Sequence, residues 1–501
     1  MFKSESELEF GLKSGFESQG LGLNKLEKKI ALNISRIFAF RMLGLFIILP
    51  IFSLYAEKLP ESTPFLLGFA LGIYGLMAGI MQAPMGMLSD YFGRKKIIAL
   101  GLVLFFLGSV LAGSAHNIYL VILGRGLQGL GAIGSSLMAL LADSTRDEVR
   151  FKAMGLIGMT IGLTFMAAMI IGPVMASFIG LSGVFYFTAI LSLVGLLILW
   201  LGIPSVKSIF HKDQEFNFHD LKIIFKSKSL WILNLGVFIL HAVLTSTFLV
   251  FPVLLLKKLG LSINHQWIIY FPVLIISFGL VIPLIILGEK RKILKSLMLL
   301  AIFILMFIEI VFIHFAFRND SLLGIATALV LFFFAFTLLE SIMPSLVSKI
   351  AKPTVRGTAM GLYSSMQFLG IFVGGAVGGY LYSLDNYLIN LDGLISYRFG
   401  SIGLVFIAGF LICALWFLIV LFMPKPSYLA TRILKINKIL ETDNLEKARK
   451  FLKHIPGIVH IYLDLDSDLN FDLIYLKIDT AVFEDDKIFS YSEQLSKNIF
   501  E

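Results

Sequence analysis

The stretch Gly86-Met-Leu-Ser-Asp-Tyr-Phe-Gly-Arg-Lys-Lys96 lies between two long apolar runs, residues 65–88 and 97–115. Asp90 and Gly93 suit a tight turn, because an Asp side chain accepts hydrogen bonds from backbone donors and Gly tolerates positive φ. The three adjacent cations at 94–96 mark the cytoplasmic side of a membrane by the positive-inside rule. This stretch therefore predicts two membrane spans joined by a short cytoplasmic link.

The composition of the whole chain indicates a polytopic membrane protein. Of its 501 residues, 57% are hydrophobic and 15% are charged, whereas soluble domains carry about a quarter charged residues. The net charge of +9 comes from cations in short links between apolar runs. These cations predict topology and contact with the lipid bilayer, and no binding to nucleic acid. The one cysteine, Cys413, excludes an internal disulfide and a CxxC metal or redox site, so we expect no metal and no organic cofactor.

Twelve segments meet the requirement of about 20 apolar residues for a membrane span. They are residues 34–56, 65–88, 97–115, 118–142, 153–179, 182–203, 229–256, 266–287, 294–317, 321–348, 355–382 and 399–423. Six lie before the central polar stretch and six after it. We therefore expect an all-α polytopic membrane protein of twelve transmembrane helices in two six-helix halves.

The spans divide the chain into five parts. These are an N-terminal tail at 1–33, a first half at 34–203, a central loop at 204–228, a second half at 229–423, and a small C-terminal domain at 424–501. The tail has no apolar core of a signal peptide, so we expect no cleavage. Lys and Arg are concentrated in the even-numbered links, which places both termini, the central loop and the C-terminal domain in the cytoplasm.

A short repeat relates the two halves. Arg150-Phe-Lys-Ala-Met-Gly155 recurs as Arg356-Gly-Thr-Ala-Met-Gly361, and each copy opens a span rich in small residues, the fifth or the eleventh. Because each half contains an even number of spans, the two copies have the same orientation in the membrane. The repeat therefore predicts parallel halves related by an axis along the membrane normal.

Three motifs carry a resemblance to a known family. The spacing G-x-L-x-D-x-x-G-R-K at 86–95 resembles the signature loop of the major facilitator superfamily, between its helices 2 and 3. Residues 123–131, with Arg125 as the charged member, resemble the second motif of that superfamily. Gly162, Gly172 and Pro173 resemble the third, which is linked to antiporters. This copy departs from the pattern at 175–176, where Met and Ala replace paired glycines, and the departure weakens the antiporter inference.

The C-terminal segment sharpens the resemblance. It reads as strand 428–436, helix 443–454, strand 457–463, strand 472–478 and a weaker helix 484–497, an order that suggests a ferredoxin-like domain. Without a cysteine, this domain is not expected to carry metal. Together with Arg41-Met-Leu-Gly in span 1 and His241-Ala-Val-Leu-Thr-Ser in span 7, the chain resembles the YajR-type drug:proton antiporters of the bacterial inner membrane.

Five ionisable residues lie inside the apolar spans. They are Arg41, Arg125, His241, Glu309 and Glu340, and each costs about 2.5–3.5 kcal/mol on the insertion scale. Snorkelling arginines and hydrogen-bonded structural groups are the alternative reading. In the superfamily, spans 1, 4, 7 and 10 line the central cavity, and four of the five residues fall one on each of these spans. Glu309 falls on the peripheral span 9 and ranks last.

The resemblance implies a mechanism. Desolvation disfavours a charged carboxylate, so Glu340 is the preferred carrier of a coupling proton, and His241 is the second candidate. The loop with Gly86, Asp90, Gly93 and Arg94 would act as a latch. Asp90 would accept hydrogen bonds near Arg356 at the start of span 11, and Arg94 would pair with Asp143, although Arg146 and Arg150 are alternative partners for Asp143. These contacts are expected to break when the halves rock inward.

We therefore expect a monomeric secondary transporter rather than an enzyme. The preferred function is proton-coupled efflux of small lipophilic or cationic compounds by alternating access. A proton-coupled symporter of a polar metabolite or sugar is one alternative, and a non-transporting membrane sensor that signals through its C-terminal domain is another. No Ser/His/Asp set, metal cluster or nucleotide motif is recognised in the sequence.

Overall fold

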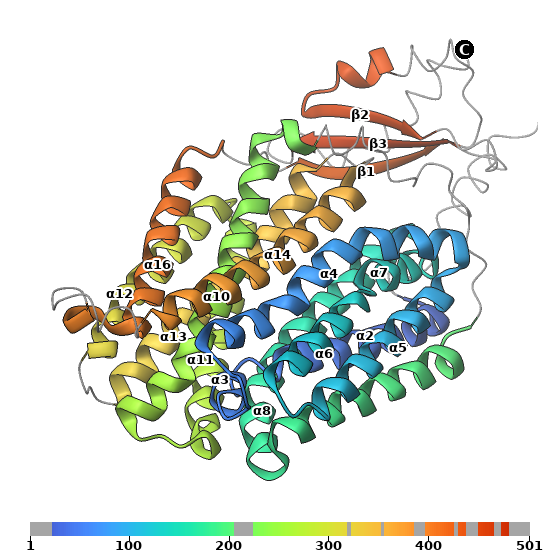
Figure 1. Ribbon diagram of the computed structural model, residues 1–501. Coiled ribbons are helices and arrows are strands. Elements are labelled where there is room, and N and C mark those ends of the chain that lie inside the picture. The colour runs from blue at the N-terminus through green and yellow to red at the C-terminus, as the bar shows by residue number, and fades with distance from the viewer. Residues whose placement is uncertain are drawn as a thin grey trace, which may run out of the picture.

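The computed structural model describes residues 23–204, 224–317, 322–351, 355–384, 396–424, 429–436, 449–464 and 472–479. A bundle of long helices carries a small antiparallel sheet near one end (Figure 1). Most of the predicted N-terminal tail, most of the predicted central loop and the predicted helix 484–497 lie outside the described residues.

The helices follow the predicted spans closely. In the N-terminal half they are α2 (Lys25–Phe46), α3 (Phe52–Ala56), α4 (Pro64–Phe92), α5 (Arg94–Gly113), α6 (Ile118–Leu130), α7 (Gly134–Asp143), α8 (Asp147–Leu197) and the π-helix η1 (Ile198–Gly202). In the C-terminal half they are α10 (Lys228–Leu259), the 3₁₀-helix η3 (Ile263–His265), α11 (Trp267–Lys290), α12 (Leu294–Phe317), α13 (Leu322–Ile350), α14 (Arg356–Ser383) and α16 (Ser396–Leu421).

Local sequence explains where several of these helices begin and end. Asn24 caps α2 in a capping box with Glu27, and Thr63 caps α4, whose first residue is a proline. Gly93, with φ of 96°, separates α4 from α5 and confirms the predicted positive φ in the link. Asp90 belongs to the last turn of α4 and pairs with the Arg94 side chain.

Ten helices among the described residues are long and apolar enough to cross a membrane. One of them, Lys152–Gly202, covers two predicted spans, because α8 continues through a break at Gly180, where φ is 67°. Predicted span 1 is divided into α2 and α3 by a turn at 47–51 that contains Pro50. The described residues therefore contain fewer such helices than the twelve predicted crossings, and the number twelve stays a prediction.

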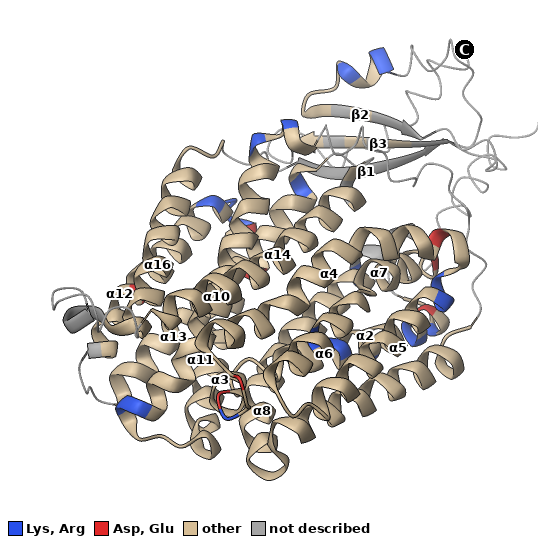
Figure 2. Cartoon of the chain, viewed as in Figure 1, with Lys and Arg blue, Asp and Glu red and all other residues tan. Residues whose placement is uncertain are grey.

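The surface of the bundle is apolar, as a lipid-facing surface requires. Leu201, Phe178 and Leu323 are 84%, 83% and 76% exposed. Figure 2 shows few charged residues along the middle of the helices, with most Lys and Arg near helix ends. A soluble protein rarely exposes so much contiguous apolar surface.

The C-terminal segment contains β1 (Leu429–Ile436), β2 (Ile458–Asp464) and β3 (Asp472–Asp479). All three predicted strands are therefore present. The sheet order is β1-β3-β2 with both pairings antiparallel, so β1 and β2 run parallel with β3 between them. Residues 449–453 are helical and precede β2, and Ile474, Leu476 and Ile478 of β3 are buried. The end of α13 contacts β1.

The two halves meet through α14, which packs against α4 of the N-terminal half and against α10 (Figure 1). Glycines bring the backbones together. A Cβ at Gly68 of α4 would lie 2.1 Å from the Gly375 carbonyl oxygen, and one at Gly374 would lie 2.2 Å from the Ala242 carbonyl oxygen. No other residue fits at such contacts without a shift of the backbone.

This close packing is confined to one end of the interface. On α4, Gly68 lies near the predicted outer end, and contacts there are closer than at Gly79, where a Cβ would have 3.3 Å to its nearest neighbours. At the predicted cytoplasmic start of α14, a Cβ on Gly357 or Gly361 would meet nothing within 4 Å. The halves therefore pack closely at the Gly68 end of the interface and leave open space around Gly357 and Gly361, an arrangement that is inward-facing in the predicted topology.

The contact between α4 and α14 makes a testable prediction. Gly375→Ala places a Cβ 2.4 Å from the Gly68 carbonyl oxygen, and we expect overpacking to reduce stability by about 1–3 kcal/mol. Gly361→Ala on the same helix meets open space and should be neutral or stabilising, because alanine favours a helix over glycine by about 0.5–1 kcal/mol. Thermal unfolding in detergent measures both. Equal midpoints for the two variants would contradict the described contact.

Candidate functional site

A cluster of polar side chains joins three helices of the C-terminal half. His241 lies on α10, Glu340 on α13 and Gln367 on α14. The Gln367 amide nitrogen lies 2.8 Å from His241 Nε2 and donates to Glu340 Oε1 at 3.2 Å. His241 Nε2 and Glu340 Oε2 are 3.8 Å apart. The structure thus brings together the two preferred proton-carrying candidates from the sequence, and Gln367 bridges them.

The histidine and the glutamate of this cluster differ in solvent exposure. The His241 side chain is 2% exposed, whereas the Glu340 side chain is 32% exposed. Glu340 Oε2 itself is enclosed and has no hydrogen-bond partner among the described residues. A carboxyl group that is partly reached by solvent while one oxygen has no donor is suited to binding a proton or a cation.

Aromatic rings from both halves lie beside the cluster. Phe336 of α13 makes an edge contact with the His241 ring at 5.7 Å between centroids. Phe165 of α8 stacks on Phe336 at 5.7 Å and meets Phe333 at 5.9 Å. The wall next to His241 is therefore apolar and aromatic, and it is built across the boundary between the halves.

Arg125 is fully enclosed in the N-terminal half. It is 1% exposed, so snorkelling to the membrane surface does not describe it. It donates to Gln128 at 3.0 Å and to the Leu71 carbonyl oxygen at 3.4 Å, and its guanidinium lies 4.8 Å from the centre of the Tyr74 ring. Such partners offset part of the cost of burying the cation.

Arg41 on α2 is also buried, at 2% exposure, and does not snorkel. In contrast to Arg125, its Nε, Nη1 and Nη2 atoms have no hydrogen-bond partner among the described residues. The described contacts place it with neither Arg125 nor the cluster at Glu340. Its predicted role in the cavity stays a prediction.

Glu309 lies apart from the cluster, between α12, α10 and α16. It is 0% exposed, and Thr247 donates to its Oε1 at 3.3 Å. A Cβ on Gly409 of α16 would lie 2.7 Å from its Oε2, so the glycine provides the space for the carboxyl group. Enclosure in a junction of three helices agrees with its low rank in the sequence analysis.

The signature link forms a compact ion-pair network. Arg94 Nε lies 3.0 Å from Asp143 Oδ2, the partner proposed from the sequence. Arg94 also pairs with Asp90 and donates to Ser89 Oγ at 2.8 Å. The side chains of Arg356 and Arg150 lie outside the described part of the structure.

The expectation that the latch contacts break when the halves rock inward stays a prediction. The ion pairs of Arg94 with Asp90 and Asp143 are intact in this structure. All three residues belong to the N-terminal half. Only a contact from Asp90 to the start of α14 would cross between the halves.

The remaining motif glycines have packing roles. A Cβ on Gly172 would lie 2.5 Å from the Ile47 carbonyl oxygen, beside the break between α2 and α3, and Pro173 follows it inside α8. A Cβ on Gly162 would lie 3.6 Å from Phe278 of α11. A Cβ on Gly86 would lie 3.2 Å from Ser135 Oγ. Gly172 and Gly86 therefore lie at close approaches, whereas Gly162 is in ordinary contact with its neighbour.

The sequence analysis did not identify Gln367, Tyr363 or Tyr74. Tyr363 is buried on α14, its hydroxyl has no partner among the described residues, and it interacts electrostatically with Glu340. Uncharged side chains inside an apolar span give a weak signal. The amide at Gln367, in a span otherwise rich in small residues, was the available clue.

The ion pair of Glu27 with Arg146 also escaped the sequence analysis. Arg146 Nε donates to Glu27 Oε1 at 2.9 Å, and its backbone nitrogen donates to the same atom at 3.1 Å. The side-chain hydrogen bond from Arg146 lowers the pKa of Glu27 to about 2. This contact ties the start of α2 to the start of α8.

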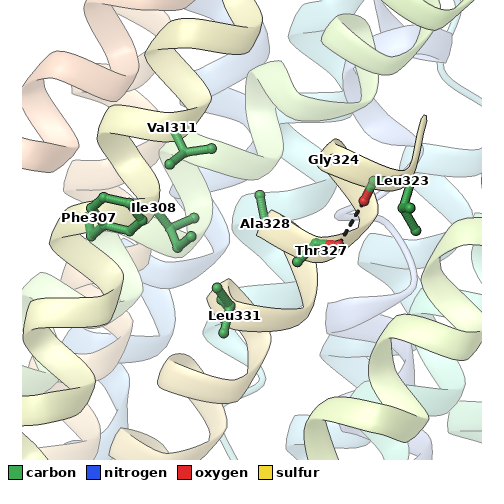
Figure 3. Close-up of a pocket in the computed structure, with 8 residues that line it drawn as sticks. All are labelled: Phe307, Ile308, Val311, Leu323, Gly324, Thr327, Ala328 and Leu331. Carbon is green, nitrogen blue, oxygen red and sulfur yellow. Dashed lines mark hydrogen bonds between the residues drawn. The ribbon is translucent and has the colours of Figure 1, made fainter. Parts of the chain in front are cut away.

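A groove of about 430 Å³ lies between α12 and α13, away from the cluster (Figure 3). Figure 3 shows apolar side chains from both helices around it, with the Thr327 hydroxyl donating to the Leu323 carbonyl oxygen at 2.8 Å. None of the predicted site residues lines it, and several of its residues face outward. It is a lipid-facing groove and not the candidate site.

Comparison with known proteins agrees with this architecture. The family model described as Major Facilitator Superfamily matches residues 35–375. The chain is 34% identical to the inner membrane transport protein YajR of Escherichia coli (strain K12), covering 91% of this chain and 95% of that protein. It is 26% identical to multidrug resistance protein 2 of Bacillus subtilis (strain 168), over 79% of this chain and 96% of that one.

A solved structure shows the same fold. A bacterial homologue of the human lysosomal transporter Spinster, in an inward-facing and occupied conformation, has a TM-score of 0.60 and 16% identity. The match covers 80% of this chain and 95% of that chain.

The ion pair at Glu27 makes a prediction about pH. Because the pKa of Glu27 is depressed from 4.5 to about 2, its contribution to stability is present above about pH 4.5 and is lost as the pH falls towards 2. Arg146 is 37% exposed, so we expect Glu27→Gln to cost about 1–2 kcal/mol at pH 7. Thermal unfolding at pH 7 and pH 3.5 should show a smaller difference from wild type at pH 3.5. Glu57→Gln, at an exposed site, is the control, and a difference that grows on acidification would contradict the assignment.

Proposed function

The chain belongs to the major facilitator superfamily, and we propose that it exports small lipophilic or cationic compounds in exchange for protons. The family and its transporter relatives support a secondary transporter in the inner membrane, spanning it many times. The proposal concerns the finer points, which are the class of substrate, the coupling proton and its direction.

The observation that carries the proposal is the position of Glu340. It is an acid within hydrogen-bonding distance of Gln367 and 3.8 Å from His241, and it is partly open to solvent. A protonated Glu340 is neutral. The transporter can therefore pass through a closed intermediate, in which the site has a low dielectric constant, at a low free-energy cost. A cation that competes with the proton for the same carboxylate yields antiport. The proton is then the coupling ion, and no other cofactor is needed.

The surroundings of Glu340 support a lipophilic substrate. Phe165, Phe333 and Phe336 form the aromatic wall that spans the two halves. Aromatic faces attract cations by about 0.5–2 kcal/mol in desolvated sites, and flat apolar surfaces accept compounds of varied shape. The similarity to a multidrug resistance protein agrees with this preference.

We further propose a membrane topology, an oligomeric state and a fold for the C-terminal domain. The chain would cross the membrane twelve times, with both termini in the cytoplasm, and act as a monomer. The split βαβ order of the C-terminal sheet, with β3 between β1 and β2, supports a ferredoxin-like domain.

We propose that a single residue of the latch makes the contact that changes between the two states. Arg94 and Asp143 keep the link folded in this state, so they shape the latch without opening it. Asp90, 39% exposed, would act as the moving contact by accepting hydrogen bonds from the start of α14 when the cytoplasmic side closes. The helix dipole favours an anion at that position.

Loss of the carrier should abolish coupling. Adding tetraphenylphosphonium to weakly buffered, detergent-purified wild-type protein should release protons, and Glu340→Gln should reduce that release to background because an amide does not titrate near neutral pH. Glu57→Gln, at an exposed site, should behave as wild type. Unchanged release from Glu340→Gln would refute the assignment, and loss in Glu309→Gln alone would transfer it to Glu309. Silence for tetraphenylphosphonium combined with proton uptake on addition of sugars would favour the symporter.

Removal of the moving latch contact should shift the conformational balance. Asp90→Asn removes an interaction with a helix dipole that is worth about 0.3–1 kcal/mol, which corresponds to about a two- to fivefold shift towards the inward-facing state. Labelling of Gly361→Cys, which faces open space in this state, by a membrane-impermeant maleimide from the cytoplasmic side measures it. Tyr91→Phe, at the exposed neighbour, is the control. Equal labelling rates with and without Asp90→Asn would exclude the latch.

A further inference from the structure

Gln367 lies between His241 and Glu340 and has no role in the transport mechanism proposed above. It lies on α14, the helix that contacts both halves, and its amide reaches the two candidate proton carriers. The amide nitrogen has two hydrogens and cannot accept. Both hydrogens are engaged, one by His241 and one by Glu340.

The hydrogen bonds determine the protonation pattern of the cluster. His241 Nδ1 lies 3.1 Å from the Val237 carbonyl oxygen, and a carbonyl oxygen only accepts, so Nδ1 carries a hydrogen. Gln367 donates to Nε2, so Nε2 presents its lone pair. His241 is therefore neutral in this arrangement, and Glu340 accepts through Oε1, which both the carboxylate and the protonated acid can do.

A proton arriving at Glu340 disturbs this pattern. Glu340 Oε2 has no partner among the described residues and lies 3.8 Å from His241 Nε2. Once protonated, Oε2 becomes a donor that can reach the same lone pair with a small movement. One lone pair accepts one strong hydrogen bond, so the protonated acid displaces the Gln367 amide. A proton on Nε2 itself would also oppose that amide, because two donors would then face each other.

Displacement of Gln367 has a direct route to the interface between the halves. The next residue, Phe368, makes an edge contact with the Tyr74 ring of α4 at 6.2 Å between centroids. The Phe368 carbonyl oxygen lies 2.4 Å from where a Cβ on Gly75 would be. Tyr74 in turn lies under the Arg125 guanidinium at 4.8 Å. A shift of α14 at Gln367 therefore changes contacts that cross between the halves.

The other titratable groups around the cluster come from each helix that packs on it. Within the described residues these are His241 of α10, Glu340 of α13 and Tyr363 of α14, with Tyr74 and Arg125 across the interface beyond Phe368. Phe336 covers the remaining side of His241. Among these described residues, Glu340 is the one carboxylate available to bind the proton.

We propose that Gln367 is the positioning residue that transmits the protonation of Glu340 to the interface between the halves. With Glu340 deprotonated, the amide holds α14 to α10 and α13. With Glu340 protonated, the amide loses His241 and keeps only its hydrogen bond to Glu340 Oε1, so α14 is held less tightly to α10 and can move against α4. This inference rests on the proposed function, in which Glu340 carries the coupling proton.

The test follows the separation of the cytoplasmic ends as the pH changes. Nitroxide labels at Lys96→Cys and Arg291→Cys, both exposed, are placed in a Cys413→Ala background in lipid nanodiscs, and their distance is measured by pulsed electron paramagnetic resonance between pH 5 and 9. Gln367→Met keeps the length and volume of the side chain without a donor. Met366→Leu on the same helix is the matched control, and Glu340→Gln reports on the carrier.

We expect the wild type and Met366→Leu to change distance with the same midpoint. In Gln367→Met the change should be lost or its midpoint should move to higher pH by at least about one unit, a tenfold change in proton binding, because no amide competes with the protonated acid. A change that is lost in Glu340→Gln and unaltered in Gln367→Met would refute the role of Gln367 and leave the carrier standing. A wild type without any change, or one unaltered in Glu340→Gln, would refute the proton carrier and this inference with it.

Discussion

The backbone-to-backbone packing of α14 is the constraint on which the arrangement of the molecule depends. Glycines at 68 and 75 of α4 and at 374 of α14 remove the side chains that would otherwise separate the helices. In a membrane, where hydrophobic burial between helices gains little, such close packing is a main source of association. It holds the halves together at the Gly68 end of the interface and leaves open space around Gly357 and Gly361. It also sets Gln367 and Phe368 at the point where the two halves communicate.

Some buried polar groups in the bundle have hydrogen-bond partners, and others keep atoms without a partner among the described residues. Arg125 has an amide, a carbonyl and an aromatic face as partners, so it stabilises one packing of the N-terminal half. Glu340 and Glu309 each keep one carboxyl oxygen without a partner among the described residues, and Arg41 has no hydrogen-bond partner there at all. Unpaired polar atoms at membrane depth are costly. Their retention is understandable where a proton or a substrate completes the site.

Charge at the cytoplasmic ends is organised within each half. Arg94 pairs with Asp143 between the link after α4 and the end of α7, and Lys349 at the end of α13 pairs with Glu289 near the end of α11. The sign of the charges is reversed between the two pairs, but each pair joins equivalent positions of the repeat. Each pair links two helices within one half, so neither pair would be broken by the proposed movement of one half against the other.

Hydropathy and turn chemistry were sufficient to predict nearly all of the helices, the positive φ at Gly93 and the three strands, because these depend on local composition and on residues near one another in the chain. The same reasoning located Glu340 and His241, since an ionisable group in an apolar span is conspicuous. It could not place Gln367 between them, because an uncharged amide acquires its meaning only from partners on α10 and α13. The tertiary structure alone decided which end of the interface between the halves is closely packed, that Arg146 pairs with Glu27, and that two nitrogens of Arg125 have hydrogen-bond partners while the Arg41 side chain has none among the described residues. Each of these depends on contacts between distant helices.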